Sequence, residues 1–194
     1  MRWGILGTGG VAHAFAEALL DVPDAELAAV GSRTRDRAHR FGERFGIPSD
    51  RAYDTYPELA ASPFIDVVYV GTPASHHHAH TMLALQAGKH VLVEKPFAVN
   101  SVQADAMFVE AHARGLLCME AMWPRFLPSW GAIRELVGQI GEVRSVEASF
   151  GGRAEFNPRS RPFRRDLGGG ALLDAAVYPL NLAQMIYGTF TEIH

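Results

Sequence analysis

Short apolar runs alternate with amphipathic stretches along the first two thirds of the chain. The pattern predicts buried strands at residues 2–6, 27–31, 66–70, 90–94 and 116–120. Between these runs, apolar residues recur at helical spacing, as Val11, Phe15 and Leu19 do after the first run. Strands that alternate with helices over short connections predict an α/β fold with a parallel, doubly wound sheet.

The alternation stops after the fifth predicted strand. A helix over about residues 129–137 is expected to precede an alternating strand over residues 143–150. An arginine- and glycine-rich loop over residues 151–170 follows. It either attracts an anionic or polyhydroxylated ligand or is solvated, and we favour the solvated loop. We predict two domains, residues 1–122 and 123–194. The second holds a single strand with no partner, so we expect it to be the incomplete start of an α+β domain.

The last predicted helix carries Asp174 and Tyr178, four residues apart and therefore on one face. Tyr178 is either a proton acceptor or a core aromatic residue. Asp174 either orients a neighbouring polar group or is a carboxylate favoured by the dipole at the helix N-terminus. Pro179 is expected to kink this helix, because it removes a backbone donor.

A glycine-rich turn joins the first predicted strand to the first predicted helix. It reads Gly7-Thr8-Gly9-Gly10-Val11-Ala12, which has the spacing G-x-G-x-x-A. Gly7 allows the tight turn, Gly9 lets a pyrophosphate approach the backbone, and Ala12 lets helix and strand pack closely. Unpaired N–H groups at the helix N-terminus favour anions. The turn predicts a dinucleotide site, with a plain tight turn as the alternative.

The end of the second predicted strand favours NADP(H) over NAD(H). A free ribose 2′-hydroxyl usually meets an acidic residue about 20 residues beyond the glycines, but Ser32 and Arg33 stand there. Arg33 and Arg37 suit a 2′-phosphate, to which Ser32 adds a hydrogen bond. The alternative is a solvated basic start of a helix, and NAD(H) stays possible.

A histidine-rich segment follows Gly71-Thr72-Pro73, at residues 76–80. Only His80 shares a helix face with His76 or His77, and no nearby carboxylate or cysteine completes a set of metal ligands. We therefore predict no metal site, and interpret the segment as the start of a helix beside the cofactor.

The fourth predicted strand ends in Glu94-Lys95-Pro96, where an open parallel sheet usually has its ligand crevice. The chain has only two lysines, Lys89 and Lys95. A lysine exchanges a proton when it is desolvated, whereas an arginine does not. Lys95 is either a catalytic group or the partner of Glu94 in a salt bridge at the end of the strand.

Composition narrows the class of protein. The net charge of −3 gives no general attraction to nucleic acid or to an anionic membrane. A single cysteine excludes an internal disulfide and fits a cytoplasmic protein. No apolar run reaches the length of about 18 residues that a membrane span needs.

Several of these motifs together resemble those of the glucose–fructose oxidoreductase / inositol dehydrogenase (Gfo/Idh/MocA) family. The shared elements are the glycine turn, Thr72-Pro73 followed by His77, Glu94-Lys95-Pro96, and residues 168–174 with Tyr178. Within the family, residues 119–126 and Tyr178 are most similar to the dimeric dihydrodiol dehydrogenases, which also act as NADP-dependent D-xylose dehydrogenases.

The resemblance implies a nicotinamide enzyme with a Rossmann domain and a second, mostly antiparallel domain that often forms a homodimer. It implies cofactor contacts from Thr72, Pro73, His77, Glu94 and Lys95. It also implies a cis proline after Lys95.

We expect hydride transfer between NADP(H) and a secondary alcohol of a sugar, polyol or trans-dihydrodiol. Lys95, Tyr178 and Asp174 are the expected catalytic residues, with Lys95 lowering the pKa of Tyr178. Trp123, Arg125, Phe126, Asp174 and Tyr178 are expected to bind substrate. For Trp123, Arg125 and Phe126 the alternative is packing between domains. The alternatives to an enzyme are an NADP(H)-binding sensor without turnover and a fragment.

Overall fold

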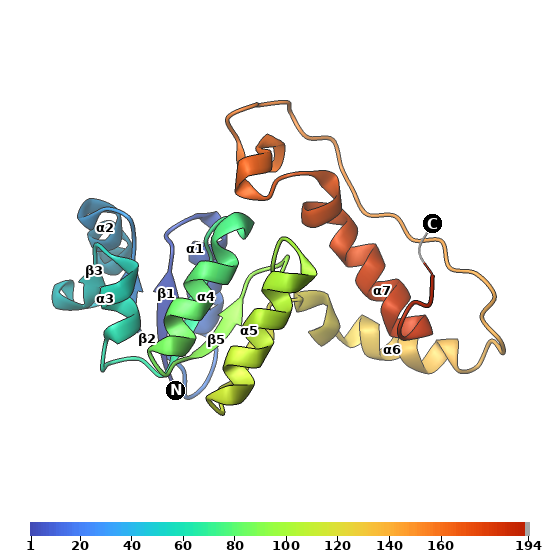
Figure 1. Ribbon diagram of the computed structural model, residues 1–194, viewed down its shortest axis with the longest axis horizontal. Helices are drawn as coiled ribbons and strands as arrows, with labels where there is room; N and C mark the ends of the chain where they lie inside the picture. The colour runs from blue at the N-terminus through green and yellow to red at the C-terminus, as the bar shows by residue number, and fades with distance from the viewer. Residues whose placement is uncertain (193–194) are drawn as a thin grey trace. The chain divides into compact units, whose positions relative to one another are not determined.

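The computed structural model of the chain describes residues 1–192 and divides into two compact units, Met1–Ala121 and Met122–His194. Figure 1 shows the strands of the first unit among several helices, and mainly helices and long connections in the second. Each unit is described by itself below.

The first unit is built on one parallel sheet of six strands in the order β3-β2-β1-β4-β5-β6. The strands are β1 (Arg2–Leu6), β2 (Glu26–Gly31), β3 (Ala52–Tyr53), β4 (Val67–Val70), β5 (His90–Val93) and β6 (Cys118–Glu120). This order confirms the predicted doubly wound α/β fold. The strand order reverses between β1 and β4, which is where such sheets bind their ligands.

Helices connect the strands and bury both faces of the sheet. They are α1 (Gly10–Leu19), α2 (Arg35–Phe45), α3 (Tyr56–Ala61), α4 (His77–Gln86) and α5 (Ser101–Ala113). Alternate residues of each strand face opposite sides. Ile5 and Tyr69 therefore pack with α1 and α2, whereas Leu6 and Val68 pack with α3, α4 and α5.

The prediction from sequence missed β3. The apolar pattern predicted no strand between residues 31 and 66, whereas Ala52–Tyr53 pairs with Val30 and Gly31 as an edge strand. Two residues are too few to show a period of two, so only the tertiary pairing identifies this strand. The short helix α3 follows at Tyr56, and Thr55 before it accepts a capping hydrogen bond from the Glu58 N–H.

The second unit contains helices and long irregular segments. Its helices are a 3₁₀ turn (Trp123–Phe126), α6 (Pro128–Val137), two 3₁₀ turns (Arg161–Phe163 and Arg165–Leu167), a π-helical turn (Leu172–Ala176) and α7 (Val177–Tyr187). The strand predicted over residues 143–150 is wrong: the segment is irregular. Alternation alone does not form a strand, which needs a neighbour to satisfy its backbone groups.

The irregularity that we expected at Pro179 lies upstream of it. Residues 172–176 form a π-helical turn, and α7 then begins at Val177, so that Pro179 falls in the first turn of an α-helix. The helical run is continuous from Ala171 through the π-helical turn into α7, so the widened turn directly precedes the proline.

Within residues 1–192, no helix is long and apolar enough to cross a membrane.

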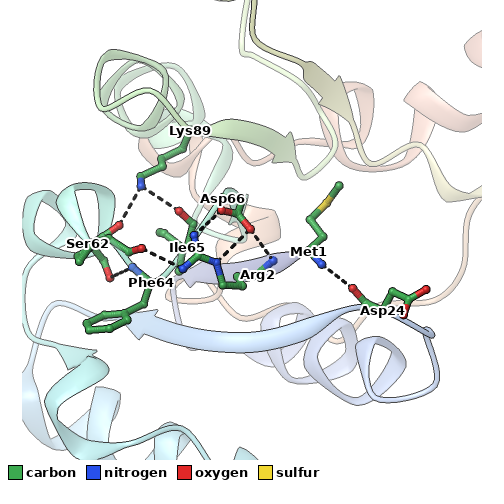
Figure 2. A network of polar contacts seen from close by, with 9 residues as sticks. Met1, Arg2, Asp24, Ser62, Phe64, Ile65, Asp66 and Lys89 are labelled. Atoms are coloured by element: carbon green, nitrogen blue, oxygen red, sulfur yellow. Dashed lines mark hydrogen bonds and ion pairs between the residues drawn. The ribbon is translucent and has the colours of Figure 1, made fainter.

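A network of polar contacts lies at the amino ends of β1 and β4 (Figure 2). Arg2 donates to both carboxylate oxygens of Asp66, from its guanidinium at 2.6 and 3.2 Å and from its backbone N–H at 2.9 Å. These hydrogen bonds lower the pKa of Asp66 from 3.8 to about 2. Lys89 donates to the carbonyls of Ser62 and Ile65 at 2.8 and 2.9 Å, and burial lowers its pKa.

We predict that Asp66→Asn destabilises the chain at neutral pH and that this difference shrinks in acid. Because the folded-state pKa of Asp66 is depressed, its contribution is present above pH 3.8 and is lost as the pH falls through about 2. Urea unfolding of both proteins at pH 7, 4 and 2 measures this. A stability difference that stays constant across this range would contradict the prediction.

Candidate functional site

The glycine turn between β1 and α1 is locked against the ends of two neighbouring strands. Gly7 has a φ of +107°, and its N–H donates to the carbonyl of Gly31 at 2.9 Å. A Cβ on Gly7 would lie 3.0 Å from the carbonyl oxygen of Gly71. Glycine is therefore required by both conformation and space. The turn directs the N-terminus of α1 to the carboxyl edge of the sheet.

A cavity of about 310 Å³ opens at this edge. It is lined by Gly7, Thr8, Gly9, Ser32, Arg33, Arg37, Tyr56, Gly71, Thr72, Pro73, His76 and His80. The lining thus brings together eight of the residues predicted to bind cofactor. Gly10, Val11 and Ala12 do not line it, and Ala12 is fully buried in the core under the turn.

One end of the cavity is basic. Ser32 is buried and lies with its hydroxyl 3.2 Å from that of Thr8, whereas Arg33 and Arg37 are exposed. Tyr56, which sequence reasoning missed, lies near both arginines. Burial raises the pKa of its hydroxyl, and the positive charges of Arg33 and Arg37 partly offset this. This end therefore offers hydroxyl donors and two cations to an anion.

His76 and His80 also line the cavity, although sequence reasoning gave them no role in binding. The His80 ring packs edge-on against Tyr56, with centroids 4.6 Å apart, and its Nδ1 lies 2.9 Å from the Thr72 hydroxyl oxygen. Burial, and then the neighbouring His76 and His77, lower the pKa of His80 to about 4. Among residues 1–192, no three histidine, cysteine or acidic side chains are placed to hold a metal ion.

His77 does not line the cavity. Its side chain is buried, with Nδ1 2.7 Å from the carbonyl oxygen of Pro96 and Nε2 2.8 Å from that of Thr72. It contacts the backbone of the loops after β4 and β5. Any effect of His77 on a cofactor is therefore exerted through these loops.

The loop after β5 carries Glu94 and Lys95, outside the lining of the cavity, and the Lys95–Pro96 peptide bond is cis. Glu94 accepts hydrogen bonds from the Tyr69 hydroxyl at 2.7 Å and from the Lys95 backbone N–H at 3.2 Å. Burial, and then the charge of Glu94, raises the pKa of Tyr69. The Phe97 N–H donates to Glu120 at 2.8 Å. Carboxylates therefore anchor both sides of this loop.

In the second unit, Tyr178 lies in an aromatic group. The Trp123 indole N–H donates to the Tyr178 hydroxyl at 3.2 Å, and the Phe150 ring lies 4.6 Å from that of Tyr178 between centroids. The neighbouring Arg125 donates to Asn181 of α7 at 3.0 Å, whereas Phe126 is exposed. The structure thus brings two of the predicted substrate-binding residues, Trp123 and Tyr178, into contact. Phe150 is an addition, since it lies in the segment predicted to be a strand.

Asp174 is paired with Arg161, whose guanidinium lies 2.8 Å from its carboxylate. Both side chains are partly buried. The interpretation of residues 151–170 as merely solvated is therefore wrong for Arg161, because the loop folds back onto the π-helical turn. Asp174 lies within this turn, and Tyr178 follows four residues later as the second residue of α7.

Gly169 makes backbone contacts that hold the arginine- and glycine-rich loop in place. Its N–H donates to the carbonyl of Arg164, and the Gly170 N–H donates to that of Pro162, both at 2.9 Å. A Cβ on Gly169 would lie 2.7 and 2.8 Å from those two carbonyl oxygens, and closer still to that of Arg161. Only glycine leaves room for this contact. The contact brings Arg161 within reach of Asp174.

Comparison with known proteins identifies the family to which the chain belongs. Residues 1–122 match the model of an oxidoreductase family with an NAD-binding Rossmann fold, and residues 131–194 match the GFO/IDH/MocA C-terminal domain. The chain belongs to the Gfo/Idh/MocA family of oxidoreductases.

Among curated relatives, a trans-1,2-dihydrobenzene-1,2-diol dehydrogenase from Sus scrofa is 40% identical over 192 residues, which cover 97% of this chain and 56% of the relative. An NADP⁺-dependent D-xylose 1-dehydrogenase from Hypocrea jecorina is 42% identical, covering 93% of this chain and 51% of the relative. Among solved structures, a 3-ketoreductase from Actinomadura kijaniata in complex with NADP and TDP-benzene superposes with a TM-score of 0.88 at 38% identity, covering 97% of this chain and 57% of that one. The chain thus spans little more than half the length of these relatives.

We predict that Gly169→Ala destabilises the second unit by about 2 kcal/mol or more, because backbone carbonyls cannot move aside cheaply for the added methyl group. Thermal unfolding, together with limited proteolysis of the loop that carries Arg161, measures this. Gly152→Ala is the matched control, since a Cβ there meets nothing within 4 Å. Equal stability of the two variants would refute the packing argument.

Proposed function

We propose that the chain binds NADP(H) in the cavity of the first unit and serves hydride transfer to and from a secondary alcohol carbon. The observation that carries this proposal is the lining of one cavity by the glycine turn and by Arg33 and Arg37 together. Membership of an oxidoreductase family with a Rossmann fold supports it.

The residues present fit a dinucleotide phosphate. The N-terminus of α1 begins beside Gly9, where unpaired N–H groups favour a pyrophosphate. Arg33 and Arg37 favour NADP(H) over NAD(H), since guanidinium groups form strong, charge-assisted hydrogen bonds with phosphate. The bound nicotinamide supplies the hydride chemistry, and the protein must bind it, orient it and handle one proton.

Lys95 and Tyr178 are the proposed groups for that proton. Lys95 follows β5 at the carboxyl edge of the sheet, where its positive charge stabilises a developing alkoxide. Tyr178 accepts or returns the hydroxyl proton, and the indole N–H of Trp123 already donates to its oxygen. Asp174, held by Arg161, orients a substrate hydroxyl.

For the substrate we propose a sugar, polyol or trans-dihydrodiol. The aromatic group of Trp123, Phe150 and Tyr178 offers flat apolar surfaces beside a hydroxyl, which suits a ring that carries vicinal hydroxyls. The names of the relatives, a dihydrodiol dehydrogenase and a D-xylose dehydrogenase, support this class.

The preference for NADPH over NADH tests the proposed role of Arg33. Arg33→Ala should weaken NADPH binding about 10-fold or more and leave NADH binding nearly unchanged, because the lost hydrogen bonds reach only the 2′-phosphate. Titration of nucleotide fluorescence measures both. Arg44→Ala is the control, since Arg44 lies on α2, the helix that follows Arg33, pairs with Glu17 and does not line the cavity. Equal losses for NADPH and NADH would contradict the assignment.

The rate of NADP⁺ reduction tests the proposed roles of Lys95 and Tyr178. Lys95→Met and Tyr178→Phe should each lower kcat for NADP⁺ reduction about 100-fold or more, with nearly unchanged NADPH affinity. Initial rates with trans-dihydrodiols and D-xylose measure this. Lys89→Met and Tyr187→Phe are matched controls, since neither residue belongs to the proposed site.

Near-native kcat in both site variants would overturn these roles. NADPH binding without consumption of any sugar or diol by the parent chain would instead favour a sensor without turnover.

A further inference from the structure

The buried His77 ring connects two loops that leave neighbouring strands. Its Nε2 lies 2.8 Å from the carbonyl oxygen of Thr72, after β4, and its Nδ1 lies 2.7 Å from that of Pro96, after β5. β4 and β5 pair in the sheet, so the ring spans the gap between adjacent strand ends. Only 1% of His77 is exposed, which leaves water little access to either contact.

The chemistry of these two contacts determines the protonation of the ring. A carbonyl oxygen accepts hydrogen bonds and cannot donate them, so each ring nitrogen must carry a hydrogen for both bonds to form. Neutral imidazole has one N–H, and only the imidazolium has two. Burial and the position of His77 at the start of α4 disfavour a positive charge, whereas two charge-assisted hydrogen bonds favour it.

We propose that His77 is a positioning residue that, as a doubly protonated imidazolium, ties the loop carrying Thr72 to the loop carrying Lys95. His77 does not line the cavity, so it acts through the backbone. Thr72 is held twice, by its carbonyl at His77 and by its hydroxyl at His80. The effect on cofactor binding rests on the proposed function, whereas the double donation does not.

Other ionisable groups lie on the elements around the ring and contribute to its local field. They are Tyr56, Glu58, Tyr69, His76, His78, His80, His90, Glu94, Lys95, Asp105, Glu110 and His112. The loop at residues 71–75 contributes none.

The protonation state is tested directly by ¹⁵N NMR of the ring in the folded parent chain at pH 7, with His77→Gln used to assign the signals. We expect both ring nitrogens of His77 to carry a hydrogen, each with a one-bond N–H coupling. One bare nitrogen at pH 7 would overturn the imidazolium. This readout needs no cofactor, so it is independent of the proposed function.

The positioning role is tested by NADPH titration of His77→Gln, which replaces the two ring nitrogens with a single amide nitrogen. We expect its dissociation constant to rise about 10-fold relative to the parent chain, as for a lost buried hydrogen bond. His112→Gln, at an exposed position on α5, should bind as the parent does. Unchanged affinity in His77→Gln would overturn the role. A parent chain that binds no NADPH would refute the proposed function and leave the NMR result to decide the state of His77.

Discussion

The geometry of the first unit depends on the close backbone contact at Gly7. Its N–H reaches the carbonyl of Gly31 at the end of β2, and its α-carbon lies so near Gly71 at the end of β4 that no side chain fits. Three strand ends are thereby held together at the point where the strand order reverses. α1 can begin only in the direction that this turn allows, and the cavity lies between its N-terminus and the loops after β2 and β4.

Most of the first unit could be predicted from the sequence, because its signals are local. Five apolar runs correspond to five of the six strands, and the spacing of the glycines marks the turn before α1. β3 was missed, since two residues carry no periodicity. Tyr56, His76 and His80 were missed as part of the cavity for another reason. These three side chains reach the cavity only because α3 and α4 pack on the sheet. No local sequence pattern indicates that packing.

The second unit was predicted less well, because long-range contacts determine it. Residues 143–150 alternate as a strand does, yet the described residues give them no strand to pair with. The arginine loop looks solvated in sequence, but Gly169 accommodates its backbone, and Arg161 pairs with Asp174. The glycine run signalled a turn, but it did not indicate which carbonyls the turn would contact.

A stack of two aromatic rings links α1, which follows the glycine turn, to the loop that carries Lys95. Phe15 of α1 lies parallel to Tyr69 of β4, with centroids 3.8 Å apart, and the Tyr69 hydroxyl donates to Glu94. The ring that supports α1 and the carboxylate that anchors the loop are thus joined through one tyrosine. Phe15, Tyr69 and Glu94 are therefore not free to change independently during evolution. A smaller residue at Phe15 or at Glu94 removes one contact of Tyr69, and a smaller residue at Tyr69 removes both, so accepted substitutions should occur in concert.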